Sequence, residues 1–168
     1  MVVRVGLCML QGARHAHIQS LQHASEKSGI EIIIHELRTE SQFEKYHCDV
    51  VILPGGDSTT MRKSGGDTES GGSGLLPALF SHLREFNSPV LGTCAGAILL
   101  CDPDDGGEPL FPASIDRNAY GRQTESFQDV IHVSLFNSQF PGVFIRAPRF
   151  NQSSILCDSI VFHGNEVV

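Results

Sequence analysis

The sequence has no surplus of positive charge and no long apolar run, and each absence excludes a class of protein. Its 12 Lys and Arg residues are outnumbered by 19 Asp and Glu residues, which gives a net charge of −7. A nucleic-acid binder needs a basic face for the phosphates, so this balance argues against one. No apolar run approaches the ~20 residues that cross a membrane. We therefore expect neither nucleic acid nor membrane among the partners.

Cysteine pairs of the kind that bind metals are also missing. The spacing of ligands in a zinc half-site is roughly two to four residues, and no two cysteines of this sequence are that close. The sequence therefore predicts no metal site. Free cysteines are usually small buried apolar residues in a reducing compartment, which we expect for all of them except Cys94. The five cysteines are Cys8, Cys48, Cys94, Cys101 and Cys157.

Length and composition predict one globular domain over residues 1–168. The chain has 168 residues, of which 40% are hydrophobic and 18% charged, so it can bury a core. The N-terminus reads as an apolar strand with no small-residue cleavage site after it, so we expect a cytoplasmic protein. Residues 63–74, and again 102–109, form loops rich in small or acidic residues. We expect 63–74 to be a flexible insertion, because its composition cannot offset its ordering entropy.

The first half of the chain alternates between strands and helices. The strands are apolar on both faces, and residues 75–86 place Leu75, Leu79, Leu83 and Phe86 on one helical face. Such alternation predicts an α/β fold whose mainly parallel sheet is covered by helices on both sides. The predicted strands are 2–10, 30–37, 49–56 and 89–92.

Strands dominate the sequence after residue 110. Residues 129–136 and 142–148 read as single strands. In 159–168 the turn residues "HGN" separate two short apolar runs, so this last segment is predicted to form a hairpin.

Cys94 lies where a strand passes into a helix, within "GTCAG" at 92–96. This is the setting of a nucleophile elbow, a strained turn that lifts a Ser or Cys above the sheet edge, with glycines where backbone comes too close for side chains. A helix start behind a thiol favours the thiolate, and the amide of Ala95 could stabilise an oxyanion. A structural cysteine in an ordinary turn is the open alternative.

Two other strand ends carry similar signals. In "LPGGDSTTMR" (53–62), Gly55 and Gly56 would let backbone amides face a ligand at close range. The alternative is a plain tight turn with Asp57 or Ser58 as a helix N-cap. Gln11 follows the first strand in the same way. The carboxyl ends of neighbouring parallel strands lie at one edge of the sheet, where ligands bind, so we expect these segments to converge on Cys94.

Five motifs follow one another along nearly the whole chain. Together they resemble the glutaminase subunit of pyridoxal 5′-phosphate synthase, a class I glutamine amidotransferase with a three-layer, flavodoxin-like sandwich. "GTCAG" alone indicates the broad amidotransferase class, whereas the two C-terminal motifs are typical of the vitamin B6 branch. The motifs are "LQG" (10–12), "PGGDSTTMR" (54–62), "GTCAG" (92–96), "RNAYGRQTESF" (117–127) and "GVFIRAP" (142–148).

The resemblance implies a reaction and its residues. Cys94 matches the nucleophile that attacks the carboxamide of L-glutamine, giving a thioester and ammonia that passes to a synthase subunit in a heteromeric complex. It implies no cofactor for this subunit. Gln11 matches a segment that helps complete the oxyanion hole, together with the amide of Ala95. Residues that match the substrate-binding positions are Gly55, Gly56, Asp57, Arg117, Ile145 and Arg146.

The sequence departs from the family pattern in the glutamine-contacting loop and in the acid–base residues. Asp57 stands where the family has glutamate. The general base and its orienting acid belong to a His-Pro-Glu motif downstream of the final hairpin, and this sequence contains no His-Pro pair. Without a positioned base, hydrolysis is expected to fall by roughly 10²–10⁴-fold.

No other histidine is expected to replace the missing base. The sequence places His132 and His163 in structural or exposed positions, and puts His15, His17 and His23 on a solvated helix face.

Three interpretations follow from these departures. We expect a glutaminase in shortened form, and the alternative is a non-catalytic binding partner of the synthase. A stress-type cysteine protein of the related α/β family, with Asp57 near the thiol, is the least favoured.

Overall fold

The chain folds into two compact units, Met1–Leu110 and Phe111–Val168, each described by itself. The computed structural model describes residues 1–12, 14–116, 119, 126–134, 137–145, 149–151, 161–163 and 166–167. The prediction of one domain over 1–168 stays a prediction, because contacts within each unit do not test it.

A parallel four-stranded sheet forms the centre of the first unit. The strand order is β2-β1-β3-β4, and every neighbouring pair is parallel. The carboxyl ends of β1, β3 and β4 therefore lie next to one another at one edge, as predicted. The strands are β1 (Val2–Cys8), β2 (Glu31–Leu37), β3 (Val50–Leu53) and β4 (Val90–Gly92).

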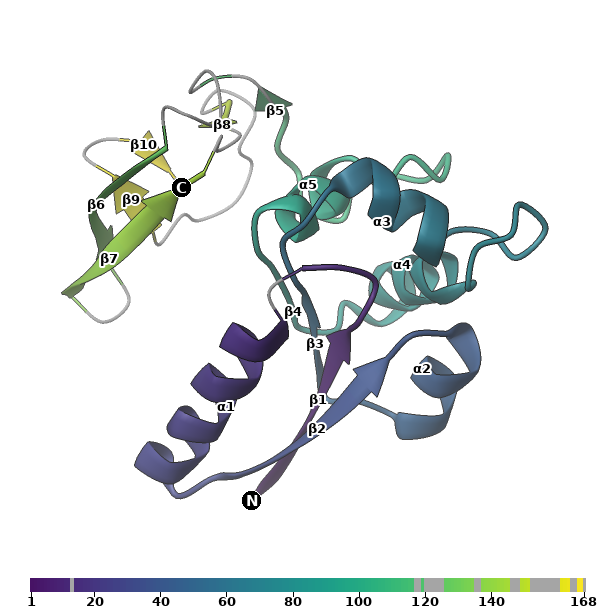
Figure 1. Ribbon diagram of the computed structural model, residues 1–168, viewed down its shortest axis with the longest axis horizontal. Helices are drawn as coiled ribbons and strands as arrows, with labels where there is room; N and C mark the ends of the chain where they lie inside the picture. The colour runs from purple at the N-terminus through teal and green to yellow at the C-terminus, as the bar shows by residue number, and fades with distance from the viewer. Residues whose placement is uncertain are drawn as a thin grey trace. The chain divides into compact units, whose positions relative to one another are not determined.

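Helices cover both faces of this sheet, which confirms the predicted α/β architecture. Figure 1 shows α1 on one side of the sheet and α2 and α4 on the other. Ile18 and Leu21 of α1 pack against a core cluster of Val5, Leu7 and Ile52. The helices are α1 (Arg14–Ser28), α2 (Glu40–Tyr46), α3 (Ser58–Gly65), α4 (Leu75–Phe86) and α5 (Ala95–Cys101).

Helix α4 has the predicted apolar face with one exception. Leu75, Leu79 and Leu83 are at most 5% exposed, whereas Phe86 is 61% exposed. Phe86 lies in the last turn, beside the helix end at Asn87, and its ring contacts His82 instead of the core. The prediction that Phe86 belongs to the buried face was wrong because the helix ends there.

Helix α2 was not predicted, since its sequence "ESQFEKY" buries none of its residues. Its start carries a signal that could have found it, a Thr followed three residues later by Gln. The side chain of Thr39 accepts a hydrogen bond from the N–H of Gln42 (3.4 Å). The side chain of Gln42 in turn accepts one from the N–H of Arg38 (2.7 Å).

The small-residue segment 63–74 is partly helical. Residues 63–65 form the end of α3, which corrects their assignment to a loop. The remainder folds back on itself, because the N–H of Gly72 donates to the carbonyl of Asp67 (2.8 Å) and that of Gly74 to Gly66 (2.8 Å). The predicted mobility of the segment stays a prediction.

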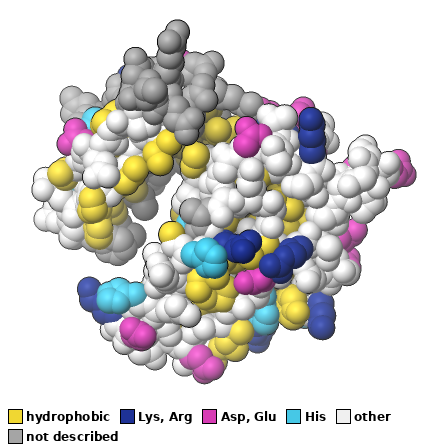
Figure 2. All heavy atoms as spheres, viewed as in Figure 1, with side chains coloured by type: hydrophobic (Ala, Val, Ile, Leu, Met, Phe, Trp, Pro, Cys, Tyr) yellow, Lys and Arg dark blue, Asp and Glu magenta, His cyan; other side chains and the backbone are white. Residues whose placement is uncertain are grey.

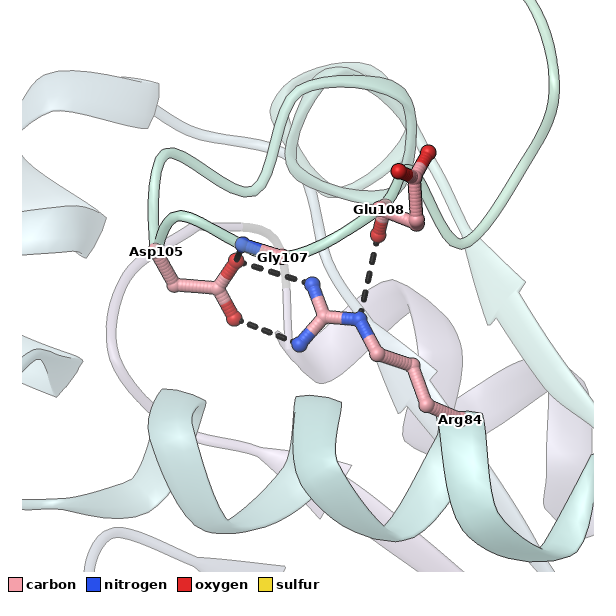
Figure 3. A network of polar contacts seen from close by, with 4 residues as sticks. All are labelled: Arg84, Asp105, Gly107 and Glu108. Carbon is pink, nitrogen blue, oxygen red and sulfur yellow. Dashed lines mark hydrogen bonds and ion pairs between the residues drawn. The ribbon is translucent and has the colours of Figure 1, made fainter.

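A charged clamp holds the loop at 102–109 against α4 (Figure 3). The guanidinium of Arg84 donates to both carboxylate oxygens of Asp105, at 2.7 and 2.8 Å, and its Nε donates to the carbonyl of Glu108 (3.0 Å). The carboxylate of Asp105 also accepts from the N–H of Gly107 (3.1 Å). These hydrogen bonds lower the pKa of Asp105, chiefly through Arg84.

The second unit is built from antiparallel strands. Its larger sheet has the order β10-β9-β6-β7, and β9 pairs with β10 as the predicted hairpin. Strand β6 ends before the predicted limit because a turn at Ser134 and Asn137 (φ 45°) follows it, and β7 accordingly starts earlier than predicted. The strands are β5 (Ile115–Asp116), β6 (Phe127–Val133), β7 (Ser138–Phe144), β8 (Arg149–Phe150), β9 (Val161–His163) and β10 (Glu166–Val167).

The surface carries charges of both signs. On the face drawn in Figure 2, acidic and basic side chains of the first unit are interspersed and do not gather into a basic patch. No helix within the described ranges is long and apolar enough to cross a bilayer. Among the same residues, no group of three His, Cys, Asp or Glu side chains could hold a metal ion.

Candidate active site

Cys94 forms a strained elbow between β4 and α5. Its backbone has φ 51° and ψ −112°, a conformation that non-glycine residues rarely adopt. A Cβ at Gly96 would lie 2.0 Å from the carbonyl oxygen of Leu53, and one at Gly92 would lie 2.8 Å from the amide nitrogen of Ala97. Close backbone packing therefore explains the glycine on each side of the elbow.

The loop after β3 lies directly against Cys94. A Cβ at Gly55 would be 3.0 Å from the Cβ of Cys94 and 3.7 Å from its Sγ. Gly56 has φ 152°, and a Cβ there would be 2.9 Å from Oε1 of Gln11. Two residues without side chains thus bring the backbone of this loop up to the thiol.

The segment after β1 completes the arrangement. Oε1 of Gln11 accepts a hydrogen bond from the N–H of Asp57 (2.7 Å). Gly12 has φ 93°, and a Cβ there would lie 1.6 Å from the carbonyl oxygen of Gly55. The three strand ends singled out in the sequence therefore meet at one edge of the sheet, with Cys94 exposed among them.

Asp57 is the N-cap of α3. Its Oδ1 accepts a hydrogen bond from the N–H of Thr60 (2.8 Å). This bond is the main reason that the pKa of Asp57 is lowered from its ordinary value. The N-cap alternative is thus confirmed, and the predicted contact of Asp57 with a ligand stays a prediction.

The buried start of α5 brings one predicted donor to the elbow. Ala95 is 1% exposed, and its N–H has no hydrogen-bond partner among the residues for which the structure gives a description. That N–H is one of the donors that a helix start leaves unsatisfied.

The structure is silent on two of the predicted site residues. Arg117 and Arg146 lie outside the described residues. Ile145 belongs to the second unit, where it is 53% exposed.

His17 was wrongly assigned to a solvated face. Its side chain is half-buried, and its Nε2 lies 3.2 Å from Oγ1 of Thr93, the residue before the elbow cysteine. Desolvation lowers the pKa of His17. A signal was present, since His17 lies four residues before Leu21, on the inward stripe of α1. His15 and His23 are exposed, as predicted.

The other histidines agree with their predicted roles. His132 is exposed. Nε2 of His163 lies 2.9 Å from a carboxylate oxygen of Asp129, and its ring contacts Phe127 and Phe144. In the part of the chain that the structure covers, no histidine hydrogen-bonds to Sγ of Cys94.

The exposure of Cys94 sets it apart from the other cysteines. Cys8 and Cys101 are buried, and burial raises the pKa of each thiol to about 12. Cys48 is half-buried, and its pKa is raised too, mainly by desolvation. Cys157 lies outside the described residues. The prediction of small buried cysteines is therefore confirmed for Cys8 and Cys101.

A model of the SNO glutamine amidotransferase family matches residues 7–166 of this sequence. The chain belongs to the SNO glutamine amidotransferase family. The match contains all three strand ends and most of the second unit. The resemblance inferred from the motifs is thereby confirmed.

Relatives of this SNO family member have a consistent name. A "Pyridoxal 5′-phosphate synthase subunit PdxT" of Thermococcus onnurineus is 38% identical, over 99% of this chain and 84% of its own. A protein of the same name from Actinobacillus pleuropneumoniae is 39% identical, over 88% of this chain and 71% of its own.

Among solved structures, a glutamine amidotransferase from Thermotoga maritima has a similar fold. Its TM-score is 0.59 at 14% identity, over 98% of this chain and 69% of that one. At this level of identity the comparison speaks for the architecture alone.

Proposed function

We propose that this chain is the glutaminase subunit of a pyridoxal 5′-phosphate synthase and that Cys94 is its nucleophile. The observation that carries the proposal is the exposed thiol on a strained elbow, with the backbone of Gly55 packed against it. The family assignment and the names of the relatives support the same reaction.

The proposed chemistry is amide hydrolysis in two stages. The Cys94 thiolate attacks the side-chain carbonyl carbon of L-glutamine and forms a tetrahedral oxyanion. The N–H of Ala95, which has no partner among the described residues, is the proposed donor to this oxyanion, with the Gln11 segment completing the hole. Collapse breaks the carbon–nitrogen bond, the nitrogen leaves as ammonia after protonation, and water then hydrolyses the thioester to glutamate.

The proposed substrate contacts follow from the charges of glutamine. The amides of Gly55 and Gly56, with Arg117 and Arg146, are suited to its carboxylate, because arginine pairs with carboxylates in a bidentate way. Ile145 and Arg146 are proposed together as a substrate-binding pair, as the family resemblance implies. The carboxylate of Asp57 has the sign needed for the ammonium group, although its N-cap bond occupies one of its oxygens.

The proposed partner is the synthase subunit that makes pyridoxal 5′-phosphate, in a heteromeric cytoplasmic complex. Ammonia is a small neutral nucleophile that water readily protonates, so a glutaminase gains from handing it directly to the enzyme that consumes it. We propose no cofactor for this chain itself.

A second candidate is a subunit that binds the synthase or glutamine without turnover. The observation that favours it is that no histidine among the described residues hydrogen-bonds to Sγ of Cys94, because a thiol nucleophile needs a base to take its proton and pass it to the leaving amine.

Glutamate release in the presence of the synthase tests both candidates. We expect the unmodified protein to release glutamate and Cys94→Ser to release none, with Cys48→Ser as a matched control that keeps wild-type activity. Stoichiometric labelling of Cys94 by a glutamine-like diazoketone without glutamate release would instead support the binding subunit. If the protein neither released glutamate nor became labelled at Cys94, both candidates would be overturned.

A further inference from the structure

The elbow at Cys94 is held mainly by backbone hydrogen bonds. The N–H of Thr93 donates to the carbonyl of Leu53 (3.0 Å), that of Gly96 to Thr93 (2.9 Å), and that of Ile98 to Cys94 (3.1 Å). A strained residue such as Cys94 persists only where its surroundings over-determine it. These bonds come from β3, β4 and α5, so they fix the elbow to the sheet but not to α1.

One side-chain contact supplies the missing connection. Nε2 of His17, on the second turn of α1, lies 3.2 Å from Oγ1 of Thr93 across 76 positions of sequence. His17 is half-buried while its helix neighbour His15 is exposed, so the imidazole is packed where the hydroxyl can meet it. Thr93 immediately precedes Cys94, and its peptide sets the direction in which the cysteine leaves the strand.

The same segment of chain also reaches the loop after β3. Gln11 lies just before α1, and its amide oxygen accepts from the N–H of Asp57 (2.7 Å). The N–H of Arg14 donates to the carbonyl of Gly12 (2.9 Å), which ties the start of the helix to the Gln11 turn. A displacement of α1 would therefore act on two of the three strand ends that surround the thiol.

We propose that His17 is a positioning residue that couples helix α1 to the nucleophile elbow through the hydroxyl of Thr93. The role rests on the proposed glutaminase function, since it concerns the orientation of the Cys94 thiol toward its substrate. Its hydrogen bond goes to Thr93 and not to the thiol, so His17 acts by holding the peptide that carries Cys94.

Paired substitutions on the two sides of this contact test the coupling. His17→Phe keeps ring bulk and removes the contact, and Thr93→Val keeps the shape of the threonine and removes its hydroxyl. Each is expected to lower kcat for glutamine about five- to tenfold, the effect of one hydrogen bond, with KM little changed. The double variant should be no worse than the single ones, because both remove one interaction. Thr93→Ser, which keeps the hydroxyl, should restore most of the rate.

Thiol chemistry gives a second readout that does not depend on glutamine. The rate of Cys94 carbamidomethylation by iodoacetamide, followed by peptide mass spectrometry on the full chain, should change severalfold in His17→Phe and Thr93→Val. His15→Phe, on the exposed face of the same helix, should leave both readouts at wild-type values.

The outcomes separate this inference from the proposed function. Wild-type activity and alkylation rates in both His17→Phe and Thr93→Val, or additive losses in the double variant, would overturn the coupling and leave the glutaminase standing. If the wild-type protein released no glutamate but both variants altered Cys94 alkylation, the coupling would stand and the proposed function would fail. If His17→Phe did not fold, the comparison of activity and alkylation rate between Thr93→Val and Thr93→Ser would decide whether the coupling exists.

Discussion

Gly55 packs directly on Cys94, so that a Cβ at Gly55 would lie 3.0 Å from the Cβ of the cysteine. Such a separation is tighter than ordinary van der Waals contact, so one of the two segments must shift if Gly55 gains a side chain. The loop after β3 is thus placed by its lack of side chains, and this makes Gly55 the most direct probe of the site.

Gly55→Ala is expected to lower kcat/KM by at least about tenfold, because small displacements at a reacting centre are costly. The thermal midpoint should change little, since Gly55 is only partly buried and lies at the rim of the core. Steady-state kinetics and a thermal melt on the same preparation check both expectations. Gly29→Asn is the control, because Gly29 has open space around it and a φ of +68° that asparagine tolerates. Equal activity of Gly55→Ala and the wild type would contradict the packing argument.

Gln11→Ala should impair glutamine hydrolysis without unfolding the protein. It removes the acceptor for the N–H of Asp57, and the loop that carries Gly56 then loses this hydrogen bond to the segment after β1. We expect a loss of several-fold in kcat/KM, the effect of one hydrogen bond. Gln11→Glu keeps an acceptor oxygen at the same distance and should retain more activity than the alanine variant. The reverse order of the two variants would argue against the hydrogen bond as the cause.

Asp105→Asn should destabilise the first unit by about 1–2 kcal/mol at neutral pH, because it replaces a charge-assisted, bidentate pair by a neutral contact. Arg84 and Asp105 are 28% and 23% exposed, so solvent screens the pair only in part. Urea unfolding measures the loss. Arg38→Ala, which removes a pair whose side chains are 50% and 44% exposed, is the matched control and should have almost no effect.

The contribution of Asp105 should also depend on pH. The hydrogen bonds from Arg84 hold the folded-state pKa of Asp105 below its ordinary value of 3.8, so the stabilisation is fully present above that value and is lost as the pH falls through the lowered pKa. The difference in unfolding free energy between wild type and Asp105→Asn should therefore shrink in acid. A difference that stays constant below pH 3.8 would contradict the ion pair as its source.

Thiol mapping should separate the cysteines by burial. At pH 8 we expect iodoacetamide to modify Cys94 in the native protein and to modify Cys8 and Cys101 only after unfolding. Burial raises the pKa of both latter thiols to about 12, so they stay protonated as well as covered. Peptide mass spectrometry of native and urea-treated samples gives the comparison. Fast native labelling of Cys8 or Cys101 would contradict the burial.

The edge that carries the site could be predicted because the carboxyl ends of neighbouring parallel strands lie at the same edge of a sheet. Apolar strands predicted the sheet, and the glycines of "PGG" and "GTCAG" marked where backbone must approach closely. The contacts of Gly12 with Gly55, and of Gly55 with Cys94, then follow from the adjacency of β1, β3 and β4.

His17 and helix α2 could not be predicted in the same way. The partner of His17 is Thr93, and nothing local to α1 indicates a contact 76 residues away. Helix α2 has no apolar stripe to reveal it, and only its capping residues carry a local signal. Phe86 shows the opposite failure, since it continues the regular apolar spacing into the last residue of α4, where its side chain is exposed.

The crowding of glycines around the thiol limits how this edge of the sheet could be remodelled. Gly12, Gly55 and Gly96 already present bare backbone, and added carbon atoms at these positions would fall 1.6, 3.0 and 2.0 Å from their neighbours. These glycines have no side chain that a substitution could shorten to admit a bulkier amide. They also have no room for a larger side chain that would exclude a smaller one. A change of substrate preference would have to come from substitutions at other positions, because these three glycines cannot accept side chains.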